Sequence, residues 1–275
     1  MEKILLVINA HHPNMDSVDF ACRIASVAQA NLTGLFIEDI FFNYAPSQTL
    51  DGGSYFDTSS PATKLIKTDI DQAVYLFKDE CLRHGITPEV YINKGQAMHE
   101  AIRESRFADL LIVDPAIGFY NRIELMPSQF VKEILAFAEC PVLLAPQQFD
   151  DLDEIIFCFD NSPSSIFAIK QFTYLLPELR TKKVMLLEVR KSGKDEFDSD
   201  HIRMMEWLRK HYQTVYYQAL KGDVSDELFS YLFMKRKKMI VMGAYGRPLL
   251  SNLFKKSSAD KLIHMLDLPL FITHH

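Results

Sequence analysis

The chain alternates short apolar runs with longer amphipathic stretches. Residues 4–8 and 155–159 are continuous apolar runs, which are typical of strands buried on both faces. Between such runs, apolar residues recur every three to four positions, as they do on the core-facing side of a helix. One such stripe consists of Ile66, Ile70, Val74, Phe77 and Cys81. Further strands are predicted at 34–39, 89–95, 184–190 and 214–220.

This pattern occurs twice along the chain. KILLVINAHHPNMDSVDFA near the start corresponds to EIIFCFDNSPSSIFAIKQF, GQAMHEAIRESRFADLLIVDP to GDVSDELFSYLFMKRKKMIVMGAYG, and ECPVLLAP to DLPLFITHH. We therefore predict two tandem domains, 1–147 and 153–275, joined by a polar, acidic link. Because strands alternate with helices of ten or more residues, each domain is expected to be an open parallel α/β sheet of about five strands, Rossmann-like, with helices on both faces. Residues 41–60, rich in Pro, Gly and Ser, predict a long surface loop.

Composition excludes some classes of partner and compartment. The 275 residues carry a formal net charge of −6, with a pI of about 5.9, which disfavours nucleic-acid and anionic-membrane partners. The four cysteines are widely spaced within apolar segments and lack metal-ligand spacing, which indicates reduced core thiols. No apolar run reaches the roughly 18 residues of a membrane span. We therefore expect a cytoplasmic protein.

Candidate ligand contacts follow the strands of the second half. Ligands of open α/β sheets bind beyond the carboxyl ends of the strands, which here brings forward Asp160, Val189 and Gly243. The segment after the first strand has no glycine and so no GxGxxG fingerprint, and the chain has no Walker P-loop. What remains is Gly243-x2-Gly246, followed after nine residues by Lys256-Ser257.

Together with Asp160, this pattern resembles the universal stress protein family. Nucleotide-binding members carry G-x2-G-x9-G-[ST] after the fourth strand and an aspartate after the first. The resemblance covers nearly the whole chain as two tandem domains of the adenine-nucleotide-hydrolase-like type. It implies that ATP or another adenine nucleotide binds in the second domain, with or without Mg²⁺. It also implies that the adenosine and the phosphates contact Cys158, Asp160, Val189, Met242, Gly243, Gly246, Lys256, Ser257 and Ser258.

The resemblance assigns these residues to different parts of the nucleotide. Cys158 and Asp160 border the adenosine, and the carboxylate accepts from a sugar hydroxyl, while backbone groups at Val189 face the adenine. Met242 and Gly243 line the base and ribose. Gly246 and the backbone of 256–258 face the phosphates.

One position departs from the family pattern, since Lys256 replaces the third glycine. Either the lysine charge attracts the phosphates and so compensates for the lost close approach of the main chain, or the lysine side chain blocks the site. Other readings need no ligand. The glycines permit a turn, Asp160 caps the following helix, and Ser257-x-x-Asp260 forms a capping box.

The first half keeps the spacing but changes the chemistry. Asp114-x2-Ile117 is followed after nine residues by Pro127-Ser128, and Asn9 stands in place of the acid. An extra negative charge, a branched side chain and a proline without an N–H oppose a phosphate. We expect the first domain not to bind ATP in the family manner.

No catalytic or metal-ligating residue is assigned, because the chain has no GxSxG, no HExxH and no paired carboxylates on one helix face. The leading hypothesis is a stress-response protein that binds an adenine nucleotide and acts as a regulatory or interaction module. The alternatives are a structural adaptor without nucleotide and a slow ATPase. By resemblance, the last strands of the two domains pair within the chain. A homodimer and an unidentified protein partner remain open.

Overall fold

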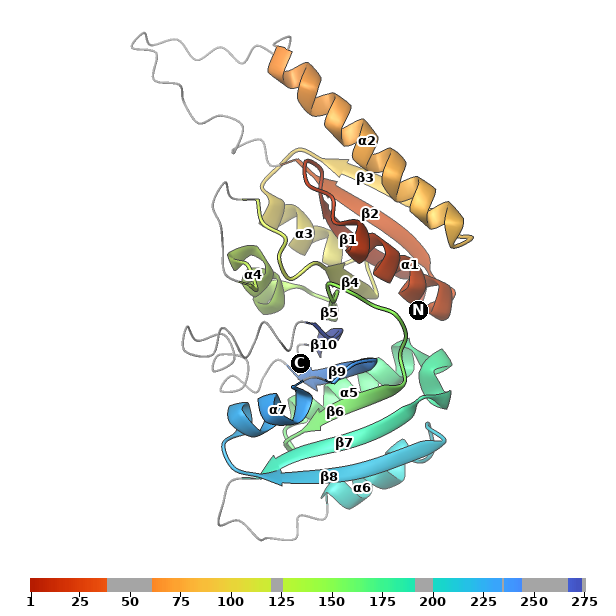
Figure 1. Ribbon diagram of the computed structural model, residues 1–275, viewed down its shortest axis with the longest axis vertical. Coiled ribbons are helices and arrows are strands. Elements are labelled where there is room, and N and C mark those ends of the chain that lie inside the picture. Colours follow the sequence, from red (N-terminus) through yellow and green to blue (C-terminus); the bar gives the residue numbers. More distant parts are fainter. Residues whose placement is uncertain (39–60, 120–125, 191–199, 234, 244–266, 274–275) are drawn as a thin grey trace, which may run out of the picture.

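The computed structural model describes residues 1–38, 61–119, 126–190, 200–233, 235–243 and 267–273 (Figure 1). The first half runs β1 (Lys3–Asn9), α1 (Met15–Ala28), β2 (Asn31–Ile37), α2 (Pro61–Arg83), β3 (Glu89–Asn93), α3 (Ala97–Ser105), β4 (Leu110–Val113), α4 (Gln129–Phe137) and β5 (Val142–Leu144). The second half runs β6 (Glu154–Phe159), α5 (Pro163–Leu175), a 3-10 turn (Pro177–Thr181), β7 (Lys183–Arg190), α6 (Asp200–Leu208), β8 (Thr214–Lys221), α7 (Val224–Leu232), β9 (Lys238–Gly243) and β10 (Leu270–Thr273).

All of these strands form one ten-stranded sheet in the order β3-β2-β1-β4-β5-β10-β9-β6-β7-β8. Strands within each half are parallel, whereas β10 pairs antiparallel with β5, Phe271 lying opposite Leu143. Because direction reverses at that junction, the carboxyl ends of the two parallel halves lie at opposite edges of the sheet. The chain order changes direction beside β1 in the first half and beside β6 in the second.

Helices cover both faces of the sheet. One apolar core contains side chains of α1, α2, α5 and α6, and the other contains side chains of α3, α4 and α7. Edge-to-face ring pairs join helix to strand on the first face, with Phe36 against Phe77 and Phe157 against Phe172. The continuous apolar strands follow from this burial on both sides.

The predicted fold class is confirmed, with two sets of parallel strands and helices on both faces. The apolar stripe of α2 meets the core through Ile70, Phe77 and Cys81. Residues 41–60 and the expected helix after Ser257 lie outside the described residues. Within the described part of the chain, no helix combines the length and apolar character that crossing a membrane requires.

Candidate functional site

The two places where the chain order changes direction are the natural ligand crevices of this sheet. In the first half the crevice lies between the ends of β1 and β4, and in the second half between those of β6 and β9. The N-terminus of the helix that follows the first strand of each half, α1 or α5, lies at the corresponding crevice. Asn9 and Asp114 therefore occupy positions equivalent to Asp160 and Gly243.

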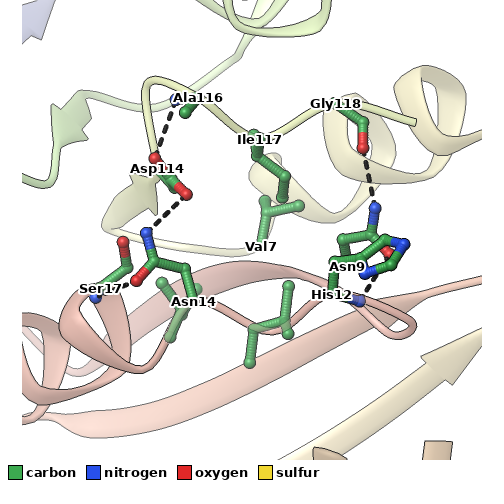
Figure 2. Close-up of a pocket in the computed structure, with 11 residues that line it drawn as sticks. Val7, Asn9, His12, Asn14, Ser17, Asp114, Ala116, Ile117 and Gly118 are labelled. Atoms are coloured by element: carbon green, nitrogen blue, oxygen red, sulfur yellow. Dashed lines mark hydrogen bonds between the residues drawn. The ribbon is translucent and has the colours of Figure 1, made fainter. Parts of the chain in front are cut away.

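A cavity of about 240 Å³ opens at the first-half crevice (Figure 2). Asn14 is the N-cap of α1, and its Oδ1 accepts the N–H groups of Asp16 and Ser17. Its Nδ2 donates to Asp114 Oδ2 at 2.8 Å, and Asp114 Oδ1 accepts the Ala116 N–H at 2.8 Å. The loop after β4 is thus tied to the start of α1 by an amide–carboxylate bond.

Both ends of the Asn9 side-chain amide are already hydrogen-bonded. Its Nδ2 donates to the Gly118 carbonyl at 2.8 Å, and its Oδ1 accepts from the His12 N–H (Figure 2). The same Oδ1 also accepts from the His11 N–H. Ser17 also lines the cavity and is 4% exposed, yet its Oγ has no hydrogen-bond partner among the described residues. A buried hydroxyl without a hydrogen-bond partner costs free energy.

Charge in this cavity opposes an anion. The described residues that line it carry the Asp114 carboxylate and no lysine or arginine. Helix N-terminal N–H groups can bind phosphate, but two of those at the start of α1, from Asp16 and Ser17, are already bonded to Asn14. Ser128, which aligns with Ser257, donates through Oγ to the Ile117 carbonyl at 2.5 Å and caps α4 by accepting from Val131 at 3.2 Å.

In the second half, Asp160 lies directly after β6 and is exposed. Its Oδ1 accepts from the Ser162 N–H at 3.0 Å and from the Ser162 hydroxyl at 2.6 Å. Ser162, not Asp160, is the N-cap of α5, because its Oγ accepts the Ser165 N–H at 3.1 Å. Asn161 completes the turn with a φ of 60°. The alternative that Asp160 itself caps the helix is therefore wrong: Asp160 supports the capping residue.

Gly243 ends β9 and packs against the first turn of α5. A Cβ at this position would lie 2.5 Å from both the carbonyl carbon and the carbonyl oxygen of Ser164, which no real Cβ tolerates. Close packing of helix on strand therefore demands glycine here whether or not a ligand binds. The same packing brings the end of β9 and the N-terminus of α5 together at one crevice.

The remaining predicted contacts differ in accessibility. Met242 is buried in β9, whereas Cys158 in β6 and Val189 in β7 are partly buried. Burial, with a smaller contribution from the charge of Asp160, raises the pKa of the Cys158 thiol to about 12. That thiol is protonated near neutral pH and is no nucleophile. Gly246, Lys256, Ser257 and Ser258 lie outside the described residues.

Sequence reasoning missed a polar network at the end of β7. Arg190 donates to both oxygens of Glu188 at 3.0 Å, and the Tyr217 hydroxyl donates to Glu188 at 2.6 Å. Burial opposes ionisation of Glu188, but the hydrogen bonds from Arg190 and Tyr217 outweigh it and lower its pKa. The His201 ring stacks on Tyr217 with centroids 5.0 Å apart, and its buried Nδ1 has no hydrogen-bond partner in the part of the chain that the structure describes. No motif joins these residues, since strand pairing and the packing of α6 bring them together.

The sequence and the fold were compared with those of known proteins. No family model matches the sequence, and no curated protein matches it significantly. Among solved structures, a universal stress protein from Archaeoglobus fulgidus DSM 4304 is similar, with a TM-score of 0.69, 12% identity and 98% of each chain covered. A Pseudomonas aeruginosa UCBPP-PA14 protein described as a universal stress protein has a TM-score of 0.58 and 16% identity, covering 100% of this chain and 93% of its own.

A functionally unknown protein from Pseudomonas aeruginosa PAO1 is also similar, with a TM-score of 0.54 and 15% identity, covering 100% of this chain and 92% of its own. At these identities the likeness is one of fold. Because both halves are covered in a single alignment, the tandem arrangement is shared as well. The chain therefore has the fold of universal stress proteins over its whole length.

Proposed function

We propose that this chain is a stress-response protein whose second half binds an adenine nucleotide and that the bound nucleotide regulates its interactions. The observation that carries the proposal is the exposed Asp160 carboxylate, held by Ser162 at the crevice between β6 and β9. A carboxylate in this place accepts hydrogen bonds from ribose hydroxyls. The N-terminus of α5 beside it favours negative charge on a ligand.

The contrast between the halves supports assigning nucleotide to the second half alone. Asn9, which is equivalent to Asp160, is only 9% exposed, and its side-chain NH₂ group already donates to the Gly118 carbonyl. Asp114 places a negative charge where the phosphates would lie. Asn14 accepts two N–H groups at the start of α1, whereas Ser162 accepts one at the start of α5. We propose that the first half contributes structure, and that the antiparallel β5–β10 pair joins the halves as an internal equivalent of a dimer.

A structural adaptor without nucleotide is the second candidate, favoured by one observation. Packing alone explains the glycine at position 243, because a side chain there would clash with Ser164. In this account Lys256 closes the crevice. We assign no catalytic residue, because no nucleophile with an adjacent base stands among the described residues of the crevice; slow ATP hydrolysis would be at most a secondary property.

Calorimetric titration with ATP, ADP and AMP separates these candidates. Hydrogen bonds to a charged group contribute about 1.5–3 kcal/mol, so Asp160→Ala should weaken nucleotide binding about 10- to 150-fold. Asn9→Ala, the matched change in the first half, should leave the Kd unaltered. Thermal melting without nucleotide checks that both variants are folded.

Two results would argue against the nucleotide site. No heat at millimolar nucleotide would favour the adaptor. Loss of binding in Asn9→Ala with retention in Asp160→Ala would move the site to the first half.

A further inference from the structure

Three ionisable side chains, none of which lines the first-half cavity, converge between α1 and the C-terminal end of α2. His84 Nε2 lies 2.9 Å from Asp19 Oδ1 and 3.4 Å from Glu80 Oε1. Glu80 lies in the last turn of α2 and His84 lies one residue beyond its end, so the i,i+4 spacing puts both donors on the same side. Asp19 approaches them from α1. All three donor atoms lie within 4.8 Å of one another.

A hydrogen bond does not account fully for this convergence. A single imidazole Nε2 carries at most one hydrogen, yet two carboxylate oxygens from different helices face it. An ion shared by the three atoms satisfies all of them at once. We propose that Asp19, Glu80 and His84 form a binding site for a divalent cation of the zinc class.

Two of the three donor separations, those from His84 Nε2 to each carboxylate, fit such an ion. With metal–ligand bonds of about 2.05 Å, donor separations of 2.9 and 3.4 Å correspond to ligand–metal–ligand angles of about 90° and 110°. These angles suit tetrahedral or five-coordinate zinc. One nitrogen and two oxygens favour Zn²⁺ or Co²⁺ over Mg²⁺ and Ca²⁺, which take oxygen ligands. Three protein ligands leave a coordination position for water.

Two arginines orient the carboxylates. Arg23 Nε contacts the outer oxygen of Asp19 at 2.8 Å, and Arg83 contacts the outer oxygen of Glu80 at 3.1 Å. Oδ1 and Oε1 are thereby turned towards His84. Hydrogen-bonded carboxylates of this kind are common among metal ligands, although the two positive charges also moderate the affinity.

The end of α2 adds a second reason for a cation here. The helix ends at Arg83, His84 follows it, and Gly85 reverses the chain with a φ of 71°. The last carbonyls of a helix carry partial negative charge, which favours positive charge at this end. A bound ion would fasten α2 to α1, the helix whose N-terminus borders the first-half cavity.

Co²⁺ titration of the full chain, followed by Zn²⁺ competition, tests the site. Visible absorption of bound Co²⁺ should saturate with one high-affinity equivalent that Zn²⁺ displaces, and Zn²⁺ should raise the melting temperature. His84→Ala should abolish both effects, and Asp19→Asn and Glu80→Gln should each weaken binding by about ten-fold or more. His99→Ala is the matched control, because His99 Nδ1 lies 3.5 Å from Glu100 Oε1 but belongs to no three-donor group in the described structure.

Melting in EDTA checks that each variant is folded, and the two carboxylate variants test the site independently if His84→Ala is unstable. The inference is overturned if the variants bind Co²⁺ with the stoichiometry and affinity of the wild type, which would leave the cluster a salt-bridge network. It is also overturned if the wild type binds no more Co²⁺ than His84→Ala. Asp160→Ala should bind the metal normally, so this test is independent of the nucleotide proposal.

Discussion

Replacing Gly243 with alanine separates the packing role of this glycine from any role in ligand binding. The added Cβ would lie 2.5 Å from the carbonyl carbon and oxygen of Ser164. These are main-chain atoms in the first turn of α5 and cannot rotate away, so the strand or the helix must shift. Overpacking a core costs about 1–3 kcal/mol, and we expect the upper part of that range, about 2–3 kcal/mol.

The assay is thermal melting of nucleotide-free protein followed by circular dichroism. At about 2–4 °C per kcal/mol for a protein of this size, Gly243→Ala should melt about 4–12 °C below the wild type. Gly118→Ala is the matched control, because among the described residues a Cβ there meets nothing closer than the Ala116 carbonyl oxygen at 4.0 Å. Equal melting temperatures for the wild type and Gly243→Ala would refute the packing argument and would favour a role for this glycine in ligand binding.

Two further predictions concern ionisation. Burial, and to a smaller extent the charge of Asp160, raises the pKa of the Cys158 thiol to about 12. Asp160→Asn should therefore speed alkylation of that thiol at mildly alkaline pH, as measured by peptide mapping. An unchanged alkylation rate would show that the two groups do not interact. The Glu188 pKa is lowered in the folded state, so its stabilisation is present above the unfolded pKa and is lost as pH falls through the folded pKa. Tyr217→Phe should flatten this acid-side loss in urea unfolding, and superimposable pH profiles would contradict the role given to the Tyr217 hydroxyl.

The alternation of apolar runs and helical stripes was sufficient to predict the sheet. Runs such as 155–159 are apolar on both sides because helices cover both faces, and the repeat places the same order of elements in each half. Two positions singled out by the internal repeat in the first half, Asn9 and Asp114, also lie together, since both line the crevice between β1 and β4.

Contacts made by packing lay beyond the sequence. Nothing in the local pattern around Gly243 names Ser164, about 80 residues earlier, as the group that excludes a side chain. The same holds for His84 and Asp19, which are 65 residues apart and meet only because α1 and α2 pack together. Asp160 could be placed at the crevice by pattern, but its support of Ser162 required the observed turn.

Photoaffinity labelling with 8-azido-ATP, followed by peptide mapping, tests the central claim most directly. The account predicts one label per chain, within residues 153–275, which excess ATP prevents and which Asp160→Ala abolishes while Asn9→Ala retains. Specific labelling within residues 1–147, or labelling that excess ATP does not prevent, would contradict it.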